Sequence, residues 1–448
     1  MASFLFIIYD LIIGLLFLAL AQYDINVSLV GFVLLYIWQV RRLFVKEKRV
    51  MGDSYSLIRF NTFFFIMYSV CTFLIPILML LGTAEEMKIM GLIDYHESYV
   101  PLSLFLSTAA VSIYSFGYLR GYNTKTVLTE KPRPIRNFSG LKNICFILAG
   151  LVTVYFTYSF INAKKAGEMD LSGVMGTLVN CFIILPVALC GYMNRYYHLS
   201  PIRFFKKYWF IFFCVLYISI SMLSLGDRLM AICLLTSTVF VVNEFVYKFS
   251  KKQILVALTA GMFFMFMISF TRGYTTLSQG FLEYRQSDDK LMVFQDVYPA
   301  NACLILGTEV KEKQGLYKPM KIIPLALSPI PFVPSLIKVA YFDGNFSSAS
   351  YLTNVNKGRL NVGDSGLGTH VVADVYVSWG VVGIFILFGL FGFFVGRCYA
   401  RRSNIFYYVA SVGFVAWSVF IPRESLFDPY RDIVWMVAIL FILYSNRK

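Results

Sequence analysis

Charged residues are scarce in this chain, making up only 15% of its 448 residues, whereas a typical soluble domain has about 25%. Hydrophobic residues amount to 58%, and the mean hydropathy is +0.67. Such a composition excludes an intrinsically disordered chain, because disorder requires low hydrophobicity. It also argues against a conventional cytosolic enzyme and indicates a protein whose main solvent is lipid.

The motifs of several common chemistries are missing as well. The eight cysteines include no CxxC pair and lie mostly in apolar runs, which disfavours a disulfide framework or a zinc site. We find no DxD, phosphate-binding loop, dinucleotide glycine motif or nucleophile elbow. Asp288 and Asp289 are an isolated acidic pair, whereas hard divalent cations need several oxygen ligands. We therefore expect neither a metal nor a cofactor.

Long apolar runs dominate what is present. Because lipid offers no hydrogen-bond partners, backbone groups in such runs must bond within their own segment, which predicts helices. The expected architecture is a single all-α integral membrane domain over residues 1–448, with the first run retained as a span. The twelve predicted spans are 4–21, 27–43, 60–82, 99–119, 142–161, 177–196, 205–223, 229–247, 253–271, 371–396, 404–421 and 432–445.

Lysine and arginine distribute unequally between alternate loops. One set of loops holds 24 of them, and the short loops of the opposite set hold 6. The positive-inside rule then places both termini in the cytoplasm. The net charge of +15 is dispersed among these loops, without the basic stripe and interleaved aromatic residues typical of nucleic-acid grooves.

One loop is far longer than the others. Residues 272–370 form a 99-residue segment between the ninth and tenth spans, expected at the outer face. Loops longer than about 12–15 residues are usually functional or disordered, and this one is not of low complexity. Its apolar stretch 322–337 is too rich in proline to cross the membrane as a helix. We expect that stretch to lie on the membrane surface or to re-enter it.

Four arginines lie at the predicted outer ends of spans, where orientation does not require positive charge: Arg228, Arg272, Arg423 and Arg431. Guanidinium groups suit bidentate recognition of phosphate, so a lipid-linked pyrophosphate is one candidate ligand. The alternative is that these arginines extend to the interface or pair locally. The acidic residues available for such pairs are Asp227, Glu424, Asp428 and Asp432.

The tenth span has polar residues at its entrance. Asp374 lies about one turn inside an apolar helix, where a charge costs roughly 2.5–3.5 kcal/mol at the bilayer centre and less near the edge. It is expected either to pair with an outer arginine or to act as a base, and His370 beside it is either structural or a second candidate base. Glycines further along this span favour close helix packing. Asp10, in the middle of the first span, has no evident partner.

Residues 220–435 resemble the Wzy-type polymerases of bacterial O-antigen and enterobacterial common antigen. The resemblance rests on the order of several short motifs around the long outer loop. They are Gly226–Arg228, Arg272, the proline-rich run Ser328–Pro334 followed by Lys338, Asn345–Tyr351, Asp364–Gly368 leading into Asp374, the glycines Gly380 and Gly383, and Pro422–Leu426.

This resemblance implies a GT-C-type glycosyltransferase of the bacterial inner membrane, without a cofactor. Such an enzyme transfers a growing glycan from undecaprenyl pyrophosphate to the non-reducing end of an incoming lipid-linked repeat unit at the periplasmic face. The four arginines and Lys338 would bind pyrophosphate, and Asp374, His370 or Glu424 would be the base. A chain-length-determining copolymerase is the implied partner.

Two alternatives stay open. O-antigen ligases typically have a histidine before a glycine-bearing helix, which His370 matches. A flippase or other transporter of lipid-linked oligosaccharides is the third possibility. It is disfavoured because the charges gather at one face, whereas transporters usually have recognisable halves and helices broken near the midplane.

Overall fold

The computed structural model describes most of the chain. The described residues are 2–52, 55–84, 93–122, 138–166, 173–225, 228–257, 259, 261, 297–317, 327, 329, 330, 348–360 and 368–445. Arg272, Lys338, most of the predicted span 253–271 and nearly all of the proline-rich stretch lie outside these ranges. Throughout the described part of the chain the regular structure is helical, without a strand, as the sequence predicts.

The elements follow one another in this order: α1 (Ala2–Leu20), α2 (Ile25–Met51), α3 (Phe60–Leu80), η2 (Glu97–Tyr99), α5 (Val100–Tyr122), α6 (Phe138–Ala166), α7 (Gly173–Val179), η3 (Asn180–Ile184), α8 (Leu185–Tyr197), α9 (Pro201–Leu225), α10 (Leu229–Phe245), α13 (Tyr298–Gln314), α16 (Ser348–Leu360), α17 (Val371–Gly383), η6 (Ile384–Phe388), α18 (Gly389–Ala400), α19 (Ile405–Trp417), η7 (Ile421–Arg423) and α20 (Asp428–Ser445).

Seven described helices are long and apolar enough to cross a membrane: Ile25–Met51, Phe60–Leu80, Glu97–Tyr122, Gly140–Asn162, Met175–Tyr197, Pro201–Ser224 and Val371–Ala400. Three shorter helices are also apolar: Phe4–Leu20, Leu229–Phe245 and Ile405–Trp417. A helical membrane protein is therefore the architecture, as composition predicts. The total of twelve spans and the sidedness of the long loop stay predictions.

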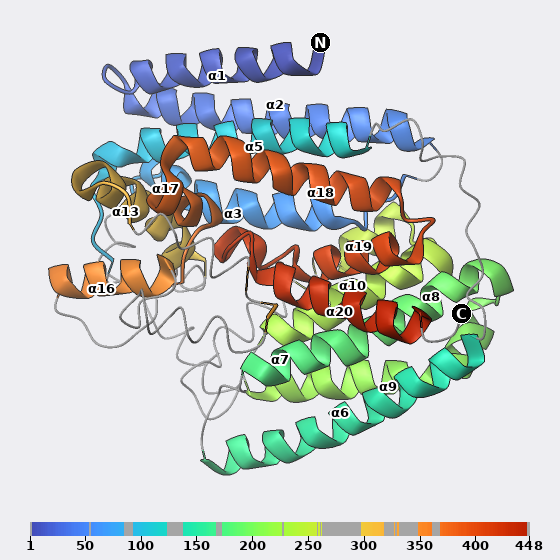
Figure 1. Ribbon diagram of the computed structural model, residues 1–448. Helices are drawn as coiled ribbons and strands as arrows, with labels where there is room; N and C mark the ends of the chain where they lie inside the picture. Colours follow the sequence, from blue (N-terminus) through green and yellow to red (C-terminus); the bar gives the residue numbers. More distant parts are fainter. Residues whose placement is uncertain are drawn as a thin grey trace.

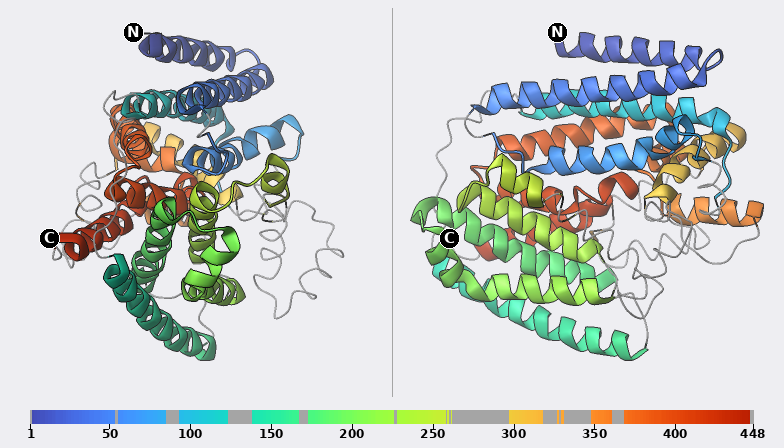
Figure 2. Two further views of the ribbon diagram at one scale, coloured as in Figure 1. Left: turned by 90° about the vertical axis from the view of Figure 1, so that its right-hand side faces the viewer. Right: turned by 180° about the vertical axis from the view of Figure 1, so that it is seen from behind.

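The long helices pack side by side as a bundle (Figures 1 and 2). The short helices α13 and α16 lie at one end of it, beside the start of α17, and we call this the site end (Figure 1, left). Helix α5 is central, because 83% of the apolar window of Glu97–Tyr122 is buried, against 28% for Gly140–Asn162 in α6. Helices α1 and α6 lie at opposite edges of the bundle.

Helices α5 and α18 touch backbone to backbone. A Cβ atom added at Gly392 or Gly396 would lie 2.2 Å from the carbonyl oxygen of Tyr114 or Tyr118, respectively. From the other side, a Cβ at Gly117 would lie 2.0 Å from the carbonyl oxygen of Gly389 on α18. Only glycine permits such an approach. The close packing that the sequence predicts for the glycines of this span is confirmed here.

Gly380 has a different role from the other glycines of the tenth span. Its φ of +62° interrupts α17, and an added Cβ would meet nothing nearer than 3.5 Å. The requirement is therefore conformational rather than steric. The carbonyl of Val377, near the break, accepts a hydrogen bond of 2.9 Å from the amide of Tyr317, which ties the chain after α13 to the bend.

The sequence offers no evident partner for Asp10, but in the structure both of its carboxylate oxygens are bonded. Arg42 donates to its Oδ1 at 3.0 Å and also to Oδ2, and the hydroxyl of Ser112 on α5 contacts Oδ2. The second span was predicted to end at residue 43, whereas α2 continues to Met51. Arg42, inside both the predicted span and the observed helix, is tolerated there because pairing with Asp10 on α1 offsets its desolvation.

The glycine contact leads to a test of packing. Gly392→Ala should destabilise the protein by about 1–3 kcal/mol, the range for overpacked cores, because its Cβ meets a carbonyl oxygen of α5. The measurement is thermal unfolding of the purified protein in detergent. Gly389→Ala is the matched control, because its Cβ would lie 3.4 Å from the nearest side-chain atom and is accommodated. Equal stability of the two variants would contradict the packing argument.

Candidate functional site

Asp374, in the first turn of α17, is the centre of the candidate site. Its side chain is almost completely buried, with the residue 4% exposed. Ser348 Oγ lies 2.5 Å from Asp374 Oδ1, and Ser425 Oγ lies 2.7 Å from Oδ2. Ser348 begins α16 and Ser425 follows η7, so three segments distant in sequence converge on one carboxyl group. We call these three residues, with Thr369 and His370, the Asp374 centre.

His370 caps the start of α17. Its Nδ1 accepts a hydrogen bond of 3.1 Å from the amide of Val372, so the ring proton is assigned to Nε2, which lies 3.2 Å from Thr72 Oγ1 on α3. The ring is fully buried, and this burial lowers the pKa of His370 to about 3. The imidazole is therefore neutral, with Nδ1 capping α17 and Nε2 holding the start of α17 against α3.

Asn301 hydrogen-bonds to the backbone of α3 beside this contact. Pro76 lies inside α3, where it lacks an amide hydrogen and distorts the preceding turn. The Asn301 side chain, from α13, donates to the carbonyl of Cys71 at 2.6 Å and lies 3.4 Å from the amide of Ile75. Because these two groups are four residues apart, the side chain bridges a turn of helix and fixes Thr72 opposite His370.

Arg423 and Glu424 immediately precede Ser425 and therefore adjoin the Asp374 centre. The backbone of Arg423 also approaches Gly368, at the start of the segment that leads into His370. Burial raises the pKa of the Glu424 carboxyl, the charge of Arg423 opposes this, and the charge of Asp374 raises it further, so the net shift is upward. Glu424 and Asp374 are therefore close enough for the charge of one carboxyl group to act on the other.

The remaining predicted arginines have other surroundings. Arg228 is buried directly before α10, and Arg431 lies in the first turn of α20. The Nε atom of Arg431 lies 3.5 Å from Asp432 Oδ1, and Asp432 Oδ2 also accepts a 2.6 Å hydrogen bond from Asn180. For Arg431 the local pairing that the sequence analysis left open is thus present. Arg272 and Lys338 lie outside the described residues.

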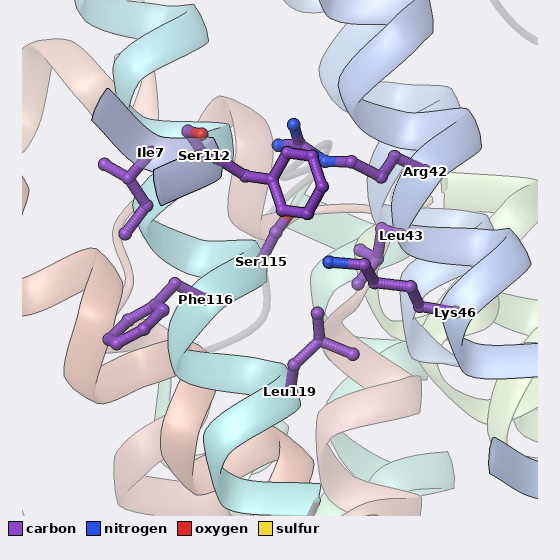
Figure 3. Close-up of a pocket in the computed structure, with 9 residues that line it drawn as sticks. Ile7, Arg42, Leu43, Lys46, Ser112, Ser115, Phe116 and Leu119 are labelled. Atoms are coloured by element: carbon purple, nitrogen blue, oxygen red, sulfur yellow. The ribbon is translucent and has the colours of Figure 1, made fainter. Parts of the chain in front are cut away.

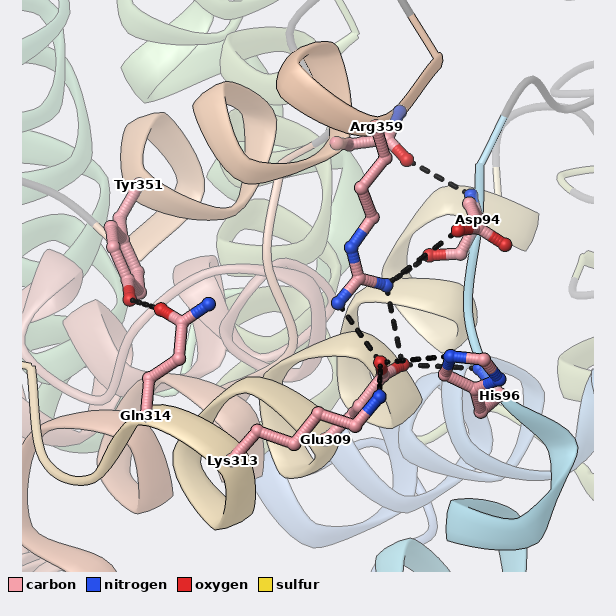
Figure 4. A network of polar contacts seen from close by, with 8 residues as sticks. Asp94, His96, Glu309, Lys313, Gln314, Tyr351 and Arg359 are labelled. Carbon is pink, nitrogen blue, oxygen red and sulfur yellow. Dashed lines mark hydrogen bonds and ion pairs between the residues drawn. The ribbon is translucent and has the colours of Figure 1, made fainter.

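A second polar network lies at the site end around Glu309 of α13 (Figure 4). The carboxylate is fully buried and accepts hydrogen bonds from Arg359 at 2.9 Å, from Lys313 at 2.8 Å and from the amide of His96 at 3.1 Å. Arg359 is on α16 and also donates to the carbonyl of Asp94 at 3.2 Å. Helix α16 is therefore anchored at one end to the Asp374 centre and at the other to Glu309.

Sequence reasoning identified Asp374, His370, Arg423 and Glu424, which the structure brings together, but it missed the hydroxyl groups. Ser348 and Ser425 lie within the motifs of the family resemblance, which assign them no role, and Thr72 and Thr369 lie outside those motifs. Serine and threonine are common in membrane helices and loops, so their identity gives no signal about which carboxyl group they bind. The helices α13 and α16 were also missed within the long loop.

Known proteins add no identification: the chain matches no family model, no curated protein and no solved structure. In the ranges that the structure describes, no group of three or more His, Cys, Asp and Glu side chains is arranged to hold a metal ion. The site is therefore interpreted from its own geometry, as a buried carboxyl centre surrounded by hydroxyl groups, with a guanidinium and a second carboxyl group beside it.

The Glu309 network leads to a pH test. Burial by itself would raise the pKa of Glu309, but the hydrogen bonds from Arg359, Lys313 and the His96 amide outweigh it and lower the pKa. A carboxyl group whose pKa is lower in the folded state stabilises the fold fully at pH values above the pKa of the unfolded state, which is about 4.3 for Glu. This stabilisation is lost as the pH falls through the folded-state pKa.

We therefore expect the unfolding temperature of the wild type to drop as the pH is lowered below about 4.3, the unfolded-state pKa. Glu309→Gln should be destabilised near neutral pH by roughly 3–5 kcal/mol, the cost of breaking a buried ion pair, and should show a flatter pH dependence. Glu97→Gln, a partly exposed carboxyl group of the same region, is the control and should keep the wild-type profile. A Glu309→Gln profile parallel to the wild type would refute this role.

Proposed function

We propose that this protein is a membrane glycosyltransferase that polymerises lipid-linked glycan repeat units. In this proposal, the growing glycan moves from undecaprenyl pyrophosphate to the non-reducing end of an incoming lipid-linked unit, at the periplasmic face of a bacterial inner membrane. The observation that supports it is the Asp374 centre with Arg423 and Glu424 beside it, at one end of an apolar helix bundle. A buried carboxyl group at a helix end is expensive unless it is used or fully bonded.

The chemistry requires a base and a stabilised leaving group. The acceptor hydroxyl oxygen forms a bond to the anomeric carbon of the donor, the bond from that carbon to the pyrophosphate oxygen breaks, and the base takes the hydroxyl proton. Undecaprenyl pyrophosphate leaves with the electron pair. We propose Asp374 as the base, because its carboxyl oxygens already accept hydrogen from two hydroxyl groups, the type of group that a sugar acceptor presents.

Glu424 and His370 take secondary roles in this proposal. Glu424, with its raised pKa, is the second candidate and is suited to exchange the proton with Asp374. His370 has both ring nitrogens engaged, so it acts as a positioning residue for the first turn of α17. This weighs against the ligase alternative, in which the corresponding histidine would take part directly.

Arg423 is the proposed partner of the leaving pyrophosphate. Hydrogen bonds to charged groups contribute roughly 1.5–3 kcal/mol each, and donors aimed at developing negative charge lower the barrier. Arg228, Arg272, Arg431 and Lys338 are further candidates for binding the lipid-linked pyrophosphates. A chain-length-determining copolymerase is the proposed partner protein, and both termini would lie in the cytoplasm.

The first test is the cell-surface polysaccharide of a strain that lacks the gene. We expect lipopolysaccharide core capped with single repeat units and no ladder on a gel, because export and ligation continue without polymerisation. Bare core with accumulated lipid-linked polymer would instead identify a ligase, and bare core with neither product would favour a flippase. An unchanged ladder would reject polymerisation of that polysaccharide.

The second test uses variants in that strain. Asp374→Asn preserves the size of the side chain and Arg423→Ala removes the guanidinium, and both should abolish the ladder while the protein stays inserted at normal abundance. Arg203→Ala, an exposed arginine in α9, is the control and should restore a normal ladder. A normal ladder from Asp374→Asn would transfer the role of base to Glu424 or His370, and one from Arg423→Ala would remove the proposed pyrophosphate contact.

A further inference from the structure

A polar crevice lies between α1, α2 and α5, away from the Asp374 centre (Figure 3). It is shallow and partly open, and the space between its walls admits a group about the size of a water molecule or a single phosphate oxygen. The lining residues relevant here are Phe6, Arg42, Lys46, Ser112, Ser115 and Leu119. Arg42 and Lys46 lie in the last three turns of α2, so the crevice is near the carboxyl-terminal end of a helix that is long and apolar enough to cross a membrane.

The crevice carries a net positive charge. Arg42 is neutralised by Asp10, but Lys46 projects toward α5 in Figure 3, and its Nζ lies 4.3 Å from the centroid of the Phe6 ring. Within the described ranges, no carboxylate lies within ion-pair distance of Lys46. A half-buried ammonium group without a carboxylate partner is a favourable site for an anion.

A second, independent feature is the hydroxyl group of Ser115. The residue is 6% exposed, and its Oγ has no hydrogen-bond partner within the described residues. Leaving a buried hydroxyl unsatisfied costs about 1–3 kcal/mol, so an oxygen atom of a bound molecule that accepts its hydrogen would be stabilising. The neighbouring Ser112 is already bonded to Asp10 and needs none.

The surface beside the crevice is apolar. Phe4 and Leu5 on α1 are 57% and 62% exposed, and Val45 on α2 is 49% exposed. Exposed side chains of this kind on spanning helices face lipid chains. A ligand here therefore has an anionic group for Lys46 and Ser115 and hydrocarbon for the flanking surface.

We propose that this crevice binds the phosphate group of an anionic membrane phospholipid. Lys46 would pair with a phosphate oxygen, and Ser115 would donate its hydroxyl hydrogen to another. Basic pockets between spanning helices are known to hold such headgroups. The site is remote from the reaction proposed above and does not depend on it; its occupation would hold α1 and α2 against α5.

The test measures thermal stabilisation of the full-length protein in neutral detergent as phosphatidylglycerol is added. We expect Lys46→Gln to need about fivefold more lipid for half-maximal stabilisation, the factor that corresponds to roughly 1 kcal/mol per basic residue. Ser115→Ala should also weaken the response. Lys48→Gln is the matched control, because it removes the same charge from an exposed position of the same helix, and it should respond as the wild type does.

Three results would overturn the proposal. The first is equal responses of Lys46→Gln and Lys48→Gln, which would indicate general electrostatic attraction. The second is equal stabilisation by phosphatidylcholine, or by inorganic phosphate alone, which would exclude an anionic lipid as the ligand. The third is a wild-type response of Ser115→Ala, which stays informative even if Lys46→Gln fails to fold, because removing one hydroxyl preserves the packing.

Discussion

The backbone contact between α5 and α18 is the interaction on which the arrangement of this bundle depends. Glycines on both helices bring carbonyl oxygens to within van der Waals contact of the opposing backbone. In lipid the hydrophobic effect does not draw helices together, so association relies on such close packing. Helix α5 continues from the segment that contacts Glu309, and α18 continues from the helix that carries Asp374. The contact therefore aligns the two elements that build the site end.

In the part of the chain that the structure describes, several buried carboxylates have partners from another element. Asp10 pairs with Arg42, Glu47 with Arg59 at 2.6 Å, and Glu309 with Arg359. Each pair joins two separate segments of the chain. A charge removed from water requires an opposite charge or hydrogen-bond donors close by. The carboxyl group of Asp374 follows the same pattern with hydroxyl partners, because Ser348 and Ser425 come from two other segments.

The two proposed sites use the membrane differently. The Asp374 centre lies where short helices cover one end of the bundle, so that a polar reaction can proceed beside lipid. The crevice at Lys46 lies on the edge formed by α1 and α2, where exposed apolar side chains meet a positive group. Both sites contain buried polar atoms near a helix end. Lipid chains cannot form hydrogen bonds with such atoms. Their separation lets lipid binding and glycan transfer be tested independently.

The sequence by itself determined that the chain is helical and membrane-embedded, because hydropathy follows from composition and because lipid permits few backbone structures. It also singled out Asp374, His370, Arg423 and Glu424, since charged groups within or beside apolar runs are conspicuous. Only the tertiary structure decided which partners they have. Ser348 and Ser425 join Asp374, and Arg42 joins Asp10, through contacts between segments far apart in the chain. Such pairings depend on helix packing, which no local pattern of residues encodes.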